Sequence, residues 1–313
     1  MSKIYSKIIS TGGYLPEKIL TNYDIEKIVD TSHDWIVERT GIFERHIASD
    51  DESSVDMAFK ASLKALKSAN LQAKDIDMIV LATTTPERKF PSTAVLLQNQ
   101  LKINNGFAFD INAACTGFIY ALDIADKYIK GGHAKNVLVV GTEKITSLLD
   151  WKDRNTCVLF GDGAGAAILT SSEIPGILSN TIGSDGSYKD LLTVNTDNEF
   201  IEMKGNDVFK IAVNTLGKLA KSTLEKNNMS IEQVDWLIPH QANSRIIKAI
   251  AKKIALPFDK IIMTVKNHGN TSAASIPLAM DYANNKGLLK KDNIIMLEAF
   301  GAGFTWGSTL LKF

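Results

Sequence analysis

The amino-acid sequence repeats one order of strand-like and helix-like runs in its two halves. Ile76-Asp-Met-Ile-Val-Leu in the first half is matched by Val234-Asp-Trp-Leu-Ile-Pro in the second, and Phe160-Gly-Asp-Gly-Ala-Gly is matched by Phe300-Gly-Ala-Gly-Phe. Continuous apolar runs of this length are typical of strands buried in parallel sheets, and their alternation with helices predicts an α/β fold. The sequence therefore predicts one βα fold used twice, in residues 1–171 and 172–313, and no low-complexity linker separates these halves.

Capping residues and periodicity place the individual elements. Ser53 or Ser54 is expected to begin a long amphipathic helix, and Thr31-Ser32 is expected to cap a short one. Further helices are predicted at 22–29, 93–101, 115–131, 205–227, 244–254 and 270–286. Further strands are predicted at 3–12, 107–109, 136–141, 156–169, 261–265, 293–297 and 303–313.

The charge balance excludes several classes of partner. The chain has 35 basic and 35 acidic residues and a pI near 7, so no overall field attracts nucleic acid or a membrane surface. The N-terminal residues lack the apolar core of a signal peptide, and no apolar run is long enough to span a membrane. With Cys115 and Cys157 as the two cysteines, a disulfide framework is excluded and a reducing compartment fits. We expect a cytoplasmic protein that binds neither nucleic acid nor membranes.

Cys115 lies at a predicted strand-to-helix junction. Residues 107–109 are apolar, residues 112–114 form a tight connection, and a helix rich in small and apolar residues is expected to begin at Cys115. The unpaired N–H groups and the positive dipole end of a helix favour thiolate over thiol, which predicts a reactive cysteine. A free cysteine is also among the most buried residue types, so packing explains this position equally well.

Two loops of the second half carry polar groups at equivalent places. Pro239-His240-Gln241-Ala242-Asn243 follows the strand at 234–238, and Asn267-His268-Gly269-Asn270-Thr271 follows the strand predicted at 261–265. Open α/β sheets place their sites at the carboxyl ends of strands. A thiolate, a His and an Asn brought together there suit acyl transfer, because the two side chains can donate hydrogen bonds to a substrate carbonyl. Taken singly, the histidine fits a structural hydrogen bond and the second loop fits a simple turn.

Three other signals are interpreted as structural. Gly161-Asp-Gly-Ala-Gly lies between apolar runs and lacks the G-x-G-x-x-G spacing, so it is not a dinucleotide-binding fingerprint. Cys157 lies in an apolar run and is expected to be inert packing. The five histidines show no ligand-like pairing with acids or thiols, so neither a metal nor a cofactor is expected.

The motifs around these residues resemble those of the thiolase-like condensing enzymes, specifically the β-ketoacyl-acyl-carrier-protein synthase III family, which starts fatty acid synthesis in bacteria. The matching segments span the chain in the family's order: TSHDWIVERTGIFERHIA (31–48), AACTGF (113–118), FGDGAGAAIL (160–169), GNDVFKIAV (205–213), HQANSRI (240–246), NHGNTSAASIP (267–277) and FGAGFTWG (300–307). The resemblance implies a thiolase-like fold. Its two halves would pack as a five-layered αβαβα sandwich about a pseudo-twofold axis, with the nucleophile helix between them.

The resemblance further implies a two-step acyltransferase reaction. Cys115 would take an acyl group from a short acyl-CoA, expected to be acetyl-CoA, and malonyl-acyl-carrier protein would then lose CO₂ and attack the acyl-enzyme as its enolate. His240 and Asn270 would complete a Cys-His-Asn triad and donate hydrogen bonds to the enolate oxygen. The backbone N–H groups of Cys115 and Ala302 would hold the tetrahedral intermediate. Ala302 departs from the family's three consecutive glycines, and its methyl group requires a backbone conformation open to alanine.

Binding residues also follow from the resemblance. Trp35 and Arg154 align with the pair that stacks on the two faces of the CoA adenine, although Trp35 could instead be an anchor of its own helix. Phe90 aligns with the residue that reaches across a homodimer to close the partner's acyl pocket, which would favour short primers. Thr31, Arg39 and Asn243 would contact CoA. A basic patch for the acidic carrier protein, equally explained singly as a solvated helix face, is expected from Lys210, Arg245, Lys252 and Lys253.

Other functions remain open at this point. A relative with the same triad could transfer acyl groups in secondary metabolism, for example to make a polyketide starter, a quinolone or an ester. A non-catalytic carrier-protein-binding module would not need all three triad members. A cysteine hydrolase would need a base to activate water, and no acid partner for His240 is evident in its motif.

Overall fold

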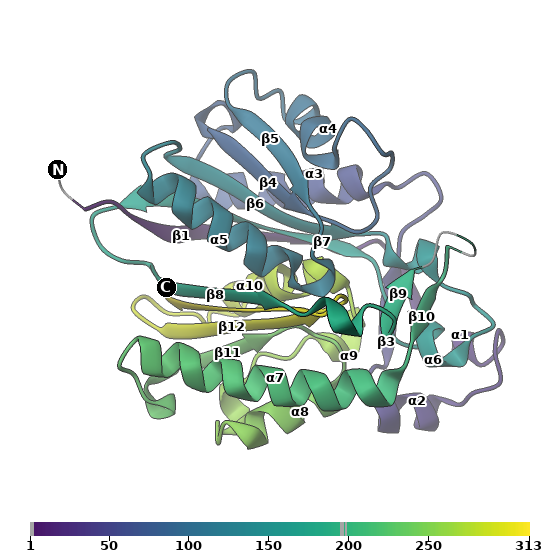
Figure 1. Ribbon diagram of the computed structural model, residues 1–313. Coiled ribbons are helices and arrows are strands. Elements are labelled where there is room, and N and C mark those ends of the chain that lie inside the picture. Colours follow the sequence, from purple (N-terminus) through teal and green to yellow (C-terminus); the bar gives the residue numbers. More distant parts are fainter. Residues whose placement is uncertain (1–2, 195–196, 198) are drawn as a thin grey trace.

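Two sheets separated by helices form the core of a computed structural model that describes residues 3–194, 197 and 199–313 (Figure 1). The first sheet has the strand order β1-β7-β6-β4-β5, and the second has the order β11-β12-β13-β8. Strands of the first sheet are β1 (Tyr5–Tyr14), β4 (Met78–Ala82), β5 (Phe107–Ile111), β6 (Asn136–Glu143) and β7 (Gly163–Ser172). Strands of the second are β8 (Ile177–Ser184), β11 (Trp236–Pro239), β12 (Ile294–Gly301) and β13 (Thr305–Lys312).

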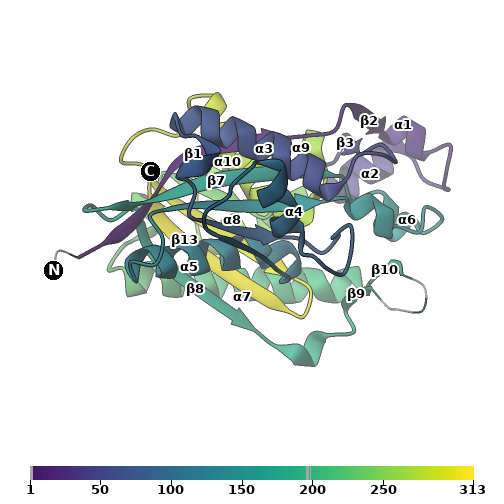
Figure 2. The same cartoon turned by 90° about the horizontal axis from the view of Figure 1, so that it is seen from above.

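Helices cover both sheets and also fill the space between them (Figures 1 and 2). The outer face of the first sheet is covered by α3 (Ser54–Ala69) and α4 (Thr93–Gln100), and that of the second by α7 (Gly205–Lys226) and α8 (Ser244–Lys253). Between the sheets lie α5 (Gly117–Lys130) and α10 (Ser275–Asn285). The predicted five-layered α/β sandwich is therefore confirmed. All strands of the first sheet lie before residue 173 and all of the second after residue 176, whereas the two-domain boundary at 171/172 stays a prediction.

The central layer is closely packed because most residues of its two helices are buried. Phe118 and Leu122 of α5 are fully buried in one cluster with residues of both sheets. Gly117 and Gly307 allow this approach: a Cβ on Gly117 would lie 2.8 Å from Cβ of Ala82, and one on Gly307 would lie 2.6 Å from Ile119. The start of α5 is thus fixed between the two sheets.

Predicted N-caps are confirmed where the side chain of the capping residue accepts a backbone N–H group of the helix that it begins. Ser53 caps α3 in a reciprocal capping box with Asp56, and Ser32 caps α2 (His33–Thr40) by accepting a bond from the backbone of Trp35. The helix predicted at 22–29 is shorter, since α1 spans only Asn22–Ile25.

One predicted strand begins later than expected, and another is wrong. The segment 156–169 contains a helical turn, α6 (Arg154–Cys157), before β7 begins at Gly163, because Asp153 caps that turn through the backbone N–H of Asn155. The segment 261–265 makes a single bridge, from Ile261 to Leu237, and then turns into α9 (Val265–His268). The sequence patterns also missed β8 and four short strands: β2 (Lys18–Thr21), β3 (Glu44–Ile47), β9 (Leu192–Val194) and β10 (Ile201–Met203).

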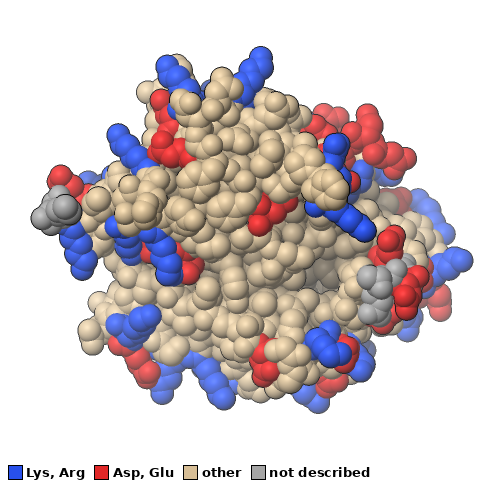
Figure 3. All heavy atoms as spheres, turned by 45° about the horizontal axis from the view of Figure 1, so that its top comes forward, with Lys and Arg blue, Asp and Glu red and all other residues tan. Residues whose placement is uncertain are grey.

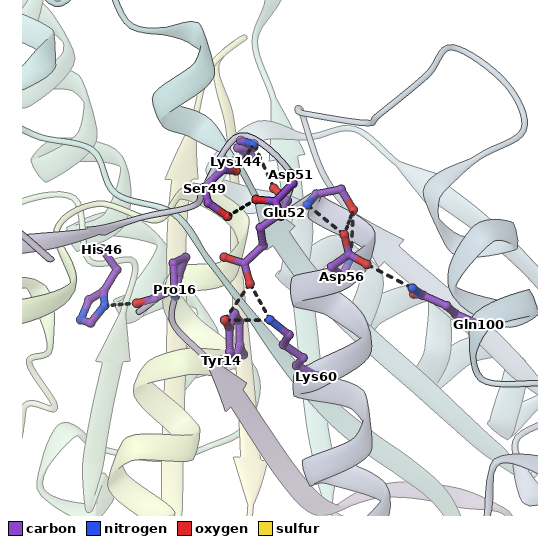
Figure 4. A network of polar contacts seen from close by, with 11 residues as sticks. Tyr14, Pro16, His46, Ser49, Asp51, Glu52, Asp56, Lys60, Gln100 and Lys144 are labelled. Carbon is purple, nitrogen blue, oxygen red and sulfur yellow. Dashed lines mark hydrogen bonds and ion pairs between the residues drawn. The ribbon is translucent and has the colours of Figure 1, made fainter. Parts of the chain in front are cut away.

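A polar network fixes the loop between β3 and α3 against the end of β6 (Figure 4). Lys144, which directly follows β6, donates from Nζ to the carbonyl oxygens of Ser49 and Glu52 at 2.7 and 2.9 Å. The Glu52 carboxylate accepts bonds from Tyr14 Oη at 2.7 Å and from Lys60 Nζ at 2.6 Å. The last residues of β6 therefore have little freedom to move.

Within the described ranges, no helix is long and apolar enough to cross a membrane.

Candidate active site

Cys115, His240 and Asn270 line a single pocket of about 510 Å³. Cys115 comes from the junction before α5, His240 from the loop after β11, and Asn270 from the loop after α9. Cys115 belongs to the first half of the chain and the other two to the second, so the pocket forms where the halves meet. The three loops singled out by the sequence thus come together.

The Cys115 thiol is held in a short turn rather than in the helix itself. It lies in the 3₁₀ turn Ala114–Thr116 that precedes α5, and Ala114 has a φ of 45°. The side chain is 8% exposed. Burial is the main cause that raises the pKa of the thiol to about 12; the nearby Ser272 side chain acts to lower the pKa and the Glu143 carboxylate acts to raise it. Desolvation thus opposes the effect of the helix end, and the reactive thiolate stays a prediction.

His240 is a neutral imidazole whose Nδ1 contacts Ser275. Burial lowers the pKa of its imidazole to about 3. Nδ1 lies 2.7 Å from Ser275 Oγ, which also accepts the backbone N–H of Gln241 at 3.3 Å. A hydroxyl that already accepts one bond satisfies both neighbours when it donates its proton to Nδ1. This arrangement supports the tautomer with its ring proton on Nε2, in which His240 offers a donor to the pocket.

Asn270 also has one end of its amide occupied. Its Oδ1 accepts the backbone N–H of Ser272 at 2.9 Å, which leaves Nδ2–H₂ to donate into the pocket. The backbone of Asn270 is tied to the first half, since its N–H donates to Leu159 at 2.8 Å and its carbonyl accepts from Gly161 at 3.1 Å. The site therefore holds two donors beside one thiol.

Gln241 joins the loops of His240 and Asn270, and sequence reasoning missed this role. Its buried Nε2 donates to the carbonyl oxygens of Pro239 and Ile262, at 2.7 and 3.2 Å. Its Oε1 accepts the backbone N–H groups of Thr264 and Val265, at 2.8 and 3.1 Å. Gln241 therefore holds the backbone at the point where the strand predicted at 261–265 turns into α9.

The loop after β12 lies against the backbone of Cys115. A Cβ on Gly301 would lie 2.9 Å from Cys115 N, so this glycine permits the close approach. Gly303 has a φ of 131°, a conformation that favours glycine, whereas Ala302 is absent from the positive-φ residues of the described chain. Of these three positions, 302 is the one at which a methyl group is compatible with the backbone.

Aromatic and basic side chains surround the mouth of the pocket. Trp35, Arg39, Asn243 and Arg245 line it. Arg154 does not, but its guanidinium lies 4.9 Å from the centre of the Trp35 ring. Asn243 is also the N-cap of α8, its Oδ1 accepting the backbone N–H of Ile246 at 2.9 Å.

Other predicted site residues lie farther from the pocket. Lys210, Lys252 and Lys253 are exposed on α7 and α8, and Lys253 bonds to Asn214. Phe90 is 83% exposed and does not line the pocket of its own chain. Thr31 is half-buried, with no partner for its hydroxyl. Their roles, like those of the triad, stay predictions.

Cys157 and the histidines show no sign of metal binding. Cys157 is fully buried, and burial raises the pKa of its thiol to about 11. Across the part of the chain that the structure describes, no group of three or more His, Cys, Asp or Glu residues could hold a metal ion.

Comparisons with known proteins place this chain in one family. Residues 109–186 match the family model of 3-oxoacyl-[acyl-carrier-protein (ACP)] synthase III, and residues 224–313 match the model of its C-terminal part. The beta-ketoacyl-[acyl-carrier-protein] synthase III of Thioalkalivibrio sulfidiphilus (strain HL-EbGR7) is 53% identical over 320 residues, with 99% of each chain covered.

Solved structures agree with this assignment. The crystal structure of 3-oxoacyl-[acyl-carrier-protein] synthase III from Aquifex aeolicus VF5 has a TM-score of 0.96 at 51% identity and covers 98% of this chain and 100% of that one. The priming β-ketosynthase of the R1128 polyketide pathway has a TM-score of 0.95 at 33% identity and covers 98% of this chain and 96% of that one. The chain belongs to the β-ketoacyl-acyl-carrier-protein synthase III family of thiolase-fold condensing acyltransferases.

Proposed function

We propose that this enzyme condenses a short acyl-CoA with malonyl-acyl-carrier protein to give β-ketoacyl-carrier protein, CoA and CO₂, the first condensation of bacterial fatty acid synthesis. One observation carries the proposal: a thiol and two fixed donors, His240 Nε2–H and Asn270 Nδ2–H₂, face one pocket. In the first step Cys115 takes the acyl group and CoA leaves. In the second, malonyl thioester enters the same pocket and loses CO₂.

The donors of His240 and Asn270 act on the malonyl thioester. Its carbonyl oxygen gains negative charge as CO₂ leaves, and two donors fixed before the reaction stabilise that charge without reorganising. The backbone N–H groups of Cys115 and Ala302 serve the tetrahedral intermediates at the thiol. No metal or cofactor is needed, because the C–C bond that breaks as CO₂ leaves supplies the electron pair of the enolate.

CoA would enter between Trp35 and Arg154. Without a ligand the guanidinium lies 4.9 Å from the Trp35 ring centre, a distance that must widen to admit an adenine between two flat groups. The rest of the CoA molecule would be contacted by Thr31, Arg39 and Asn243. Trp35→Ala should raise KM for acyl-CoA while kcat changes little, because the ring lies far from the bonds that change.

The carrier protein would dock on α7 and α8 through four exposed basic residues, namely Lys210, Arg245, Lys252 and Lys253. Arg245 lines the pocket mouth, so a phosphopantetheine arm bound there could reach Cys115.

A homodimer would form along β5, the edge strand of the first sheet. Phe107 on this strand and Phe90 nearby in sequence are exposed, at 39% and 83%. The face in Figure 3 has a broad central band with few charged side chains, which gather toward its outline. A second copy would cover apolar side chains and complete the strand's hydrogen bonds. Phe90 would then close the partner's acyl pocket and limit primer length. We also propose that the enzyme acts in the cytoplasm.

Mass analysis of protein and product tests the reaction. The enzyme is incubated with malonyl-carrier protein and acetyl-, isobutyryl- or octanoyl-CoA, and both proteins are weighed. We expect an acyl adduct on Cys115, a β-ketoacyl-carrier protein, and fastest transfer from acetyl-CoA. Cys115→Ser should lose the adduct, and His240→Ala should keep it while losing most of the decarboxylation. Normal decarboxylation by His240→Ala would contradict the roles assigned here.

A second function, starting a polyketide rather than a fatty acid, is favoured by the 33% identical priming ketosynthase. The same panel separates the two: preference for a long or branched primer over acetyl-CoA would support the second.

A further inference from the structure

Two threonines connect the turn of Cys115 to the loop after β12. Thr116 directly follows Cys115 in the first half of the chain, and Thr305 is the first residue of β13 in the second. The Thr116 hydroxyl donates to the carbonyl oxygen of Thr305 at 3.2 Å, and the Thr305 hydroxyl donates back to Thr116 Oγ1 at 3.1 Å. These reciprocal bonds make Thr116 and Thr305, here called the threonine pair, a direct link between the two halves.

The hydroxyl of Thr305 also contacts the chain on both sides of Cys115. Its Oγ1 lies 3.1 Å from the carbonyl oxygen of Ala113, 3.1 Å from Thr116 Oγ1 and 3.2 Å from the carbonyl oxygen of Ala302. A hydroxyl carries one proton, so these three acceptors share it. One oxygen atom therefore joins the residues that flank Cys115 to Ala302.

The two backbones joined in this way each have an N–H group available to a ligand. Across the described residues, neither the N–H of Cys115 nor that of Ala302 donates to a backbone oxygen. Gly301 lets the two segments approach, because a Cβ there would lie 2.9 Å from Cys115 N. Backbone N–H groups that are removed from bulk water are rarely left without an acceptor, so these two are suited to bind a substrate oxygen.

Packing fixes Thr116 as firmly as its hydrogen bonds do. The residue is fully buried, so its hydroxyl depends on protein partners, and Thr305 supplies both of them. On its apolar side, Thr116 Cγ2 would lie 3.4 Å from a Cβ on Gly307 of β13. The turn of Cys115 is thus held against the start of β13 by polar and apolar contacts together.

We propose that Thr116 and Thr305 are positioning residues that hold the N–H groups of Cys115 and Ala302 as one binding site for the oxygen of the acyl group. As Sγ bonds to the acyl carbon, the carbonyl electron pair moves onto this oxygen. When the pair returns, the C–S bond to CoA breaks, and the thiol proton of Cys115 ends on CoA. Donors stabilise the charged oxygen most when their spacing is fixed before the charge forms, and the threonine pair fixes it.

Two probes of Cys115 separate an effect on the oxygen from an effect on the thiol. Acylation by acetyl-CoA places charge on an oxygen, whereas alkylation by iodoacetamide displaces iodide from a saturated carbon and does not. Thr305→Val removes the hydroxyl and keeps the branched shape. We expect acylation to fall by about tenfold, less than the 10²–10³ typical of deleting a donor outright, while alkylation stays unchanged. An equal fall in both rates, or no fall in acylation, would overturn the proposal.

Two further variants test whether the hydroxyl itself is responsible. Thr305→Ser restores it and should return acylation to nearly the rate of the unchanged enzyme; a serine variant as slow as Thr305→Val would overturn the proposal. Thr116→Val should lower acylation in the same direction, and it carries the test if Thr305→Val fails to fold. The double variant should be no slower than Thr305→Val, because both changes break one set of bonds, and additive losses would contradict that.

Thr309→Val is the matched control on the same strand. Thr309 is fully buried on β13, and its hydroxyl donates to Asn180 Oδ1 at 2.7 Å, with no bond to the turn of Cys115 or to Ala302. Its variant also loses a buried hydroxyl bond and should lower the Tm, as Thr305→Val does. The ratio of acylation to alkylation should nevertheless stay unchanged. A fall in this ratio would show that the effect is not particular to the threonine pair.

The inference rests on the proposed function, but the two can fail separately. 4-Nitrophenyl acetate acylates a thiol without CoA or a carrier protein: an S–C bond forms and the C–O bond to 4-nitrophenolate breaks. Its rate, corrected with Cys115→Ser, should fall in Thr305→Val as the rate with acetyl-CoA does. That fall in an enzyme that forms no β-ketoacyl product would refute the condensation alone. Unchanged acylation of Thr305→Val by both reagents, with condensation intact, would refute the role of the threonine pair alone.

Discussion

Ser275 Oγ lies 2.7 Å from Nδ1 of His240, and this contact decides which nitrogen of the ring faces the pocket. Ser275 begins α10 in the central layer, 35 residues along the chain from His240. A histidine that presents Nε2–H can donate to a developing enolate, whereas the other tautomer would present a lone pair and repel it.

Ser275→Ala should therefore impair decarboxylation more than acyl transfer. Without the hydroxyl, both tautomers of His240 become accessible and the Gln241 N–H loses an acceptor. We expect a loss of roughly tenfold in malonyl decarboxylation, smaller than the 10²–10³ typical of deleting a donor outright. Decarboxylation by pre-acylated enzyme measures it, and the rate of acylation by acetyl-CoA is the control. An equal fall in both rates would point to a general loss of structure instead.

Ala302→Gly should keep activity but lower stability. Ala302 has no positive φ, so its methyl group restricts the unfolded chain without straining the folded one. Glycine there should lower the free energy of unfolding by about 0.4–1 kcal/mol. Urea denaturation measures the change, with condensation assayed in parallel. Gly301→Ala is the informative partner, since a Cβ 2.9 Å from Cys115 N should abolish acylation; an active Gly301→Ala would contradict the packing described.

Gly141→Ala should destabilise the protein by roughly 1–3 kcal/mol, because the new methyl group overlaps the carbonyl of Ala273 and neither backbone can retreat. Gly186→Ala is its control, since nothing lies within 4 Å of a Cβ at that position. Thermal unfolding of the two variants should separate them clearly. Equal midpoints would mean that β6 and the turn at Ser272 are not in close contact.

Stability should fall as the pH is lowered from about 6.5. Burial lowers the pKa of His240 to about 3 and that of His268 to about 4, from an ordinary value of 6.5. The unfolded chain therefore binds protons that the folded one does not. The contribution of these two histidines to the free energy of unfolding is complete above pH 6.5 and is lost as the pH approaches these lower values. Denaturant titrations across this range measure the slope, which His268→Gln should reduce. An unchanged slope would show that His268 already binds its proton in the folded state.

Local sequence patterns predicted the layers of the fold and the loops of the site, because both depend on residues that are close together in the sequence. Apolar runs predicted the buried strands, and Ser53 predicted the start of α3. The loops of Cys115, His240 and Asn270 were singled out by their place after apolar runs, although the loop of Asn270 follows α9 rather than a strand. The strand at 261–265 was wrong because the chain turns into α9 at Val265, where Gln241, some twenty residues earlier, accepts the N–H groups of Thr264 and Val265.

The reactivity of Cys115 could not be read from its own segment. A helix start predicts a thiolate, but the pKa depends on how much water surrounds the sulfur and on Glu143, which is distant in sequence. No local pattern encodes the contacts of four other residues at the site, namely Ser272, Ser275, Gln241 and Glu143. Ser272 and Ser275 lie inside a matched motif, yet nothing in that motif says which partner each one holds.

The position of α5 between the two sheets affects how long an acyl group can stay on Cys115. A thioester formed on Cys115 meets bulk water only through the pocket, since the remaining sides are closed by the packed central layer. Such an intermediate can wait, so the enzyme can be loaded while acyl-CoA is plentiful and discharged when a carrier protein arrives. The rate at which new acyl chains start would then be set by whichever reactant is scarcer at that moment. Acyl-CoA and the carrier protein need never be bound at the same time.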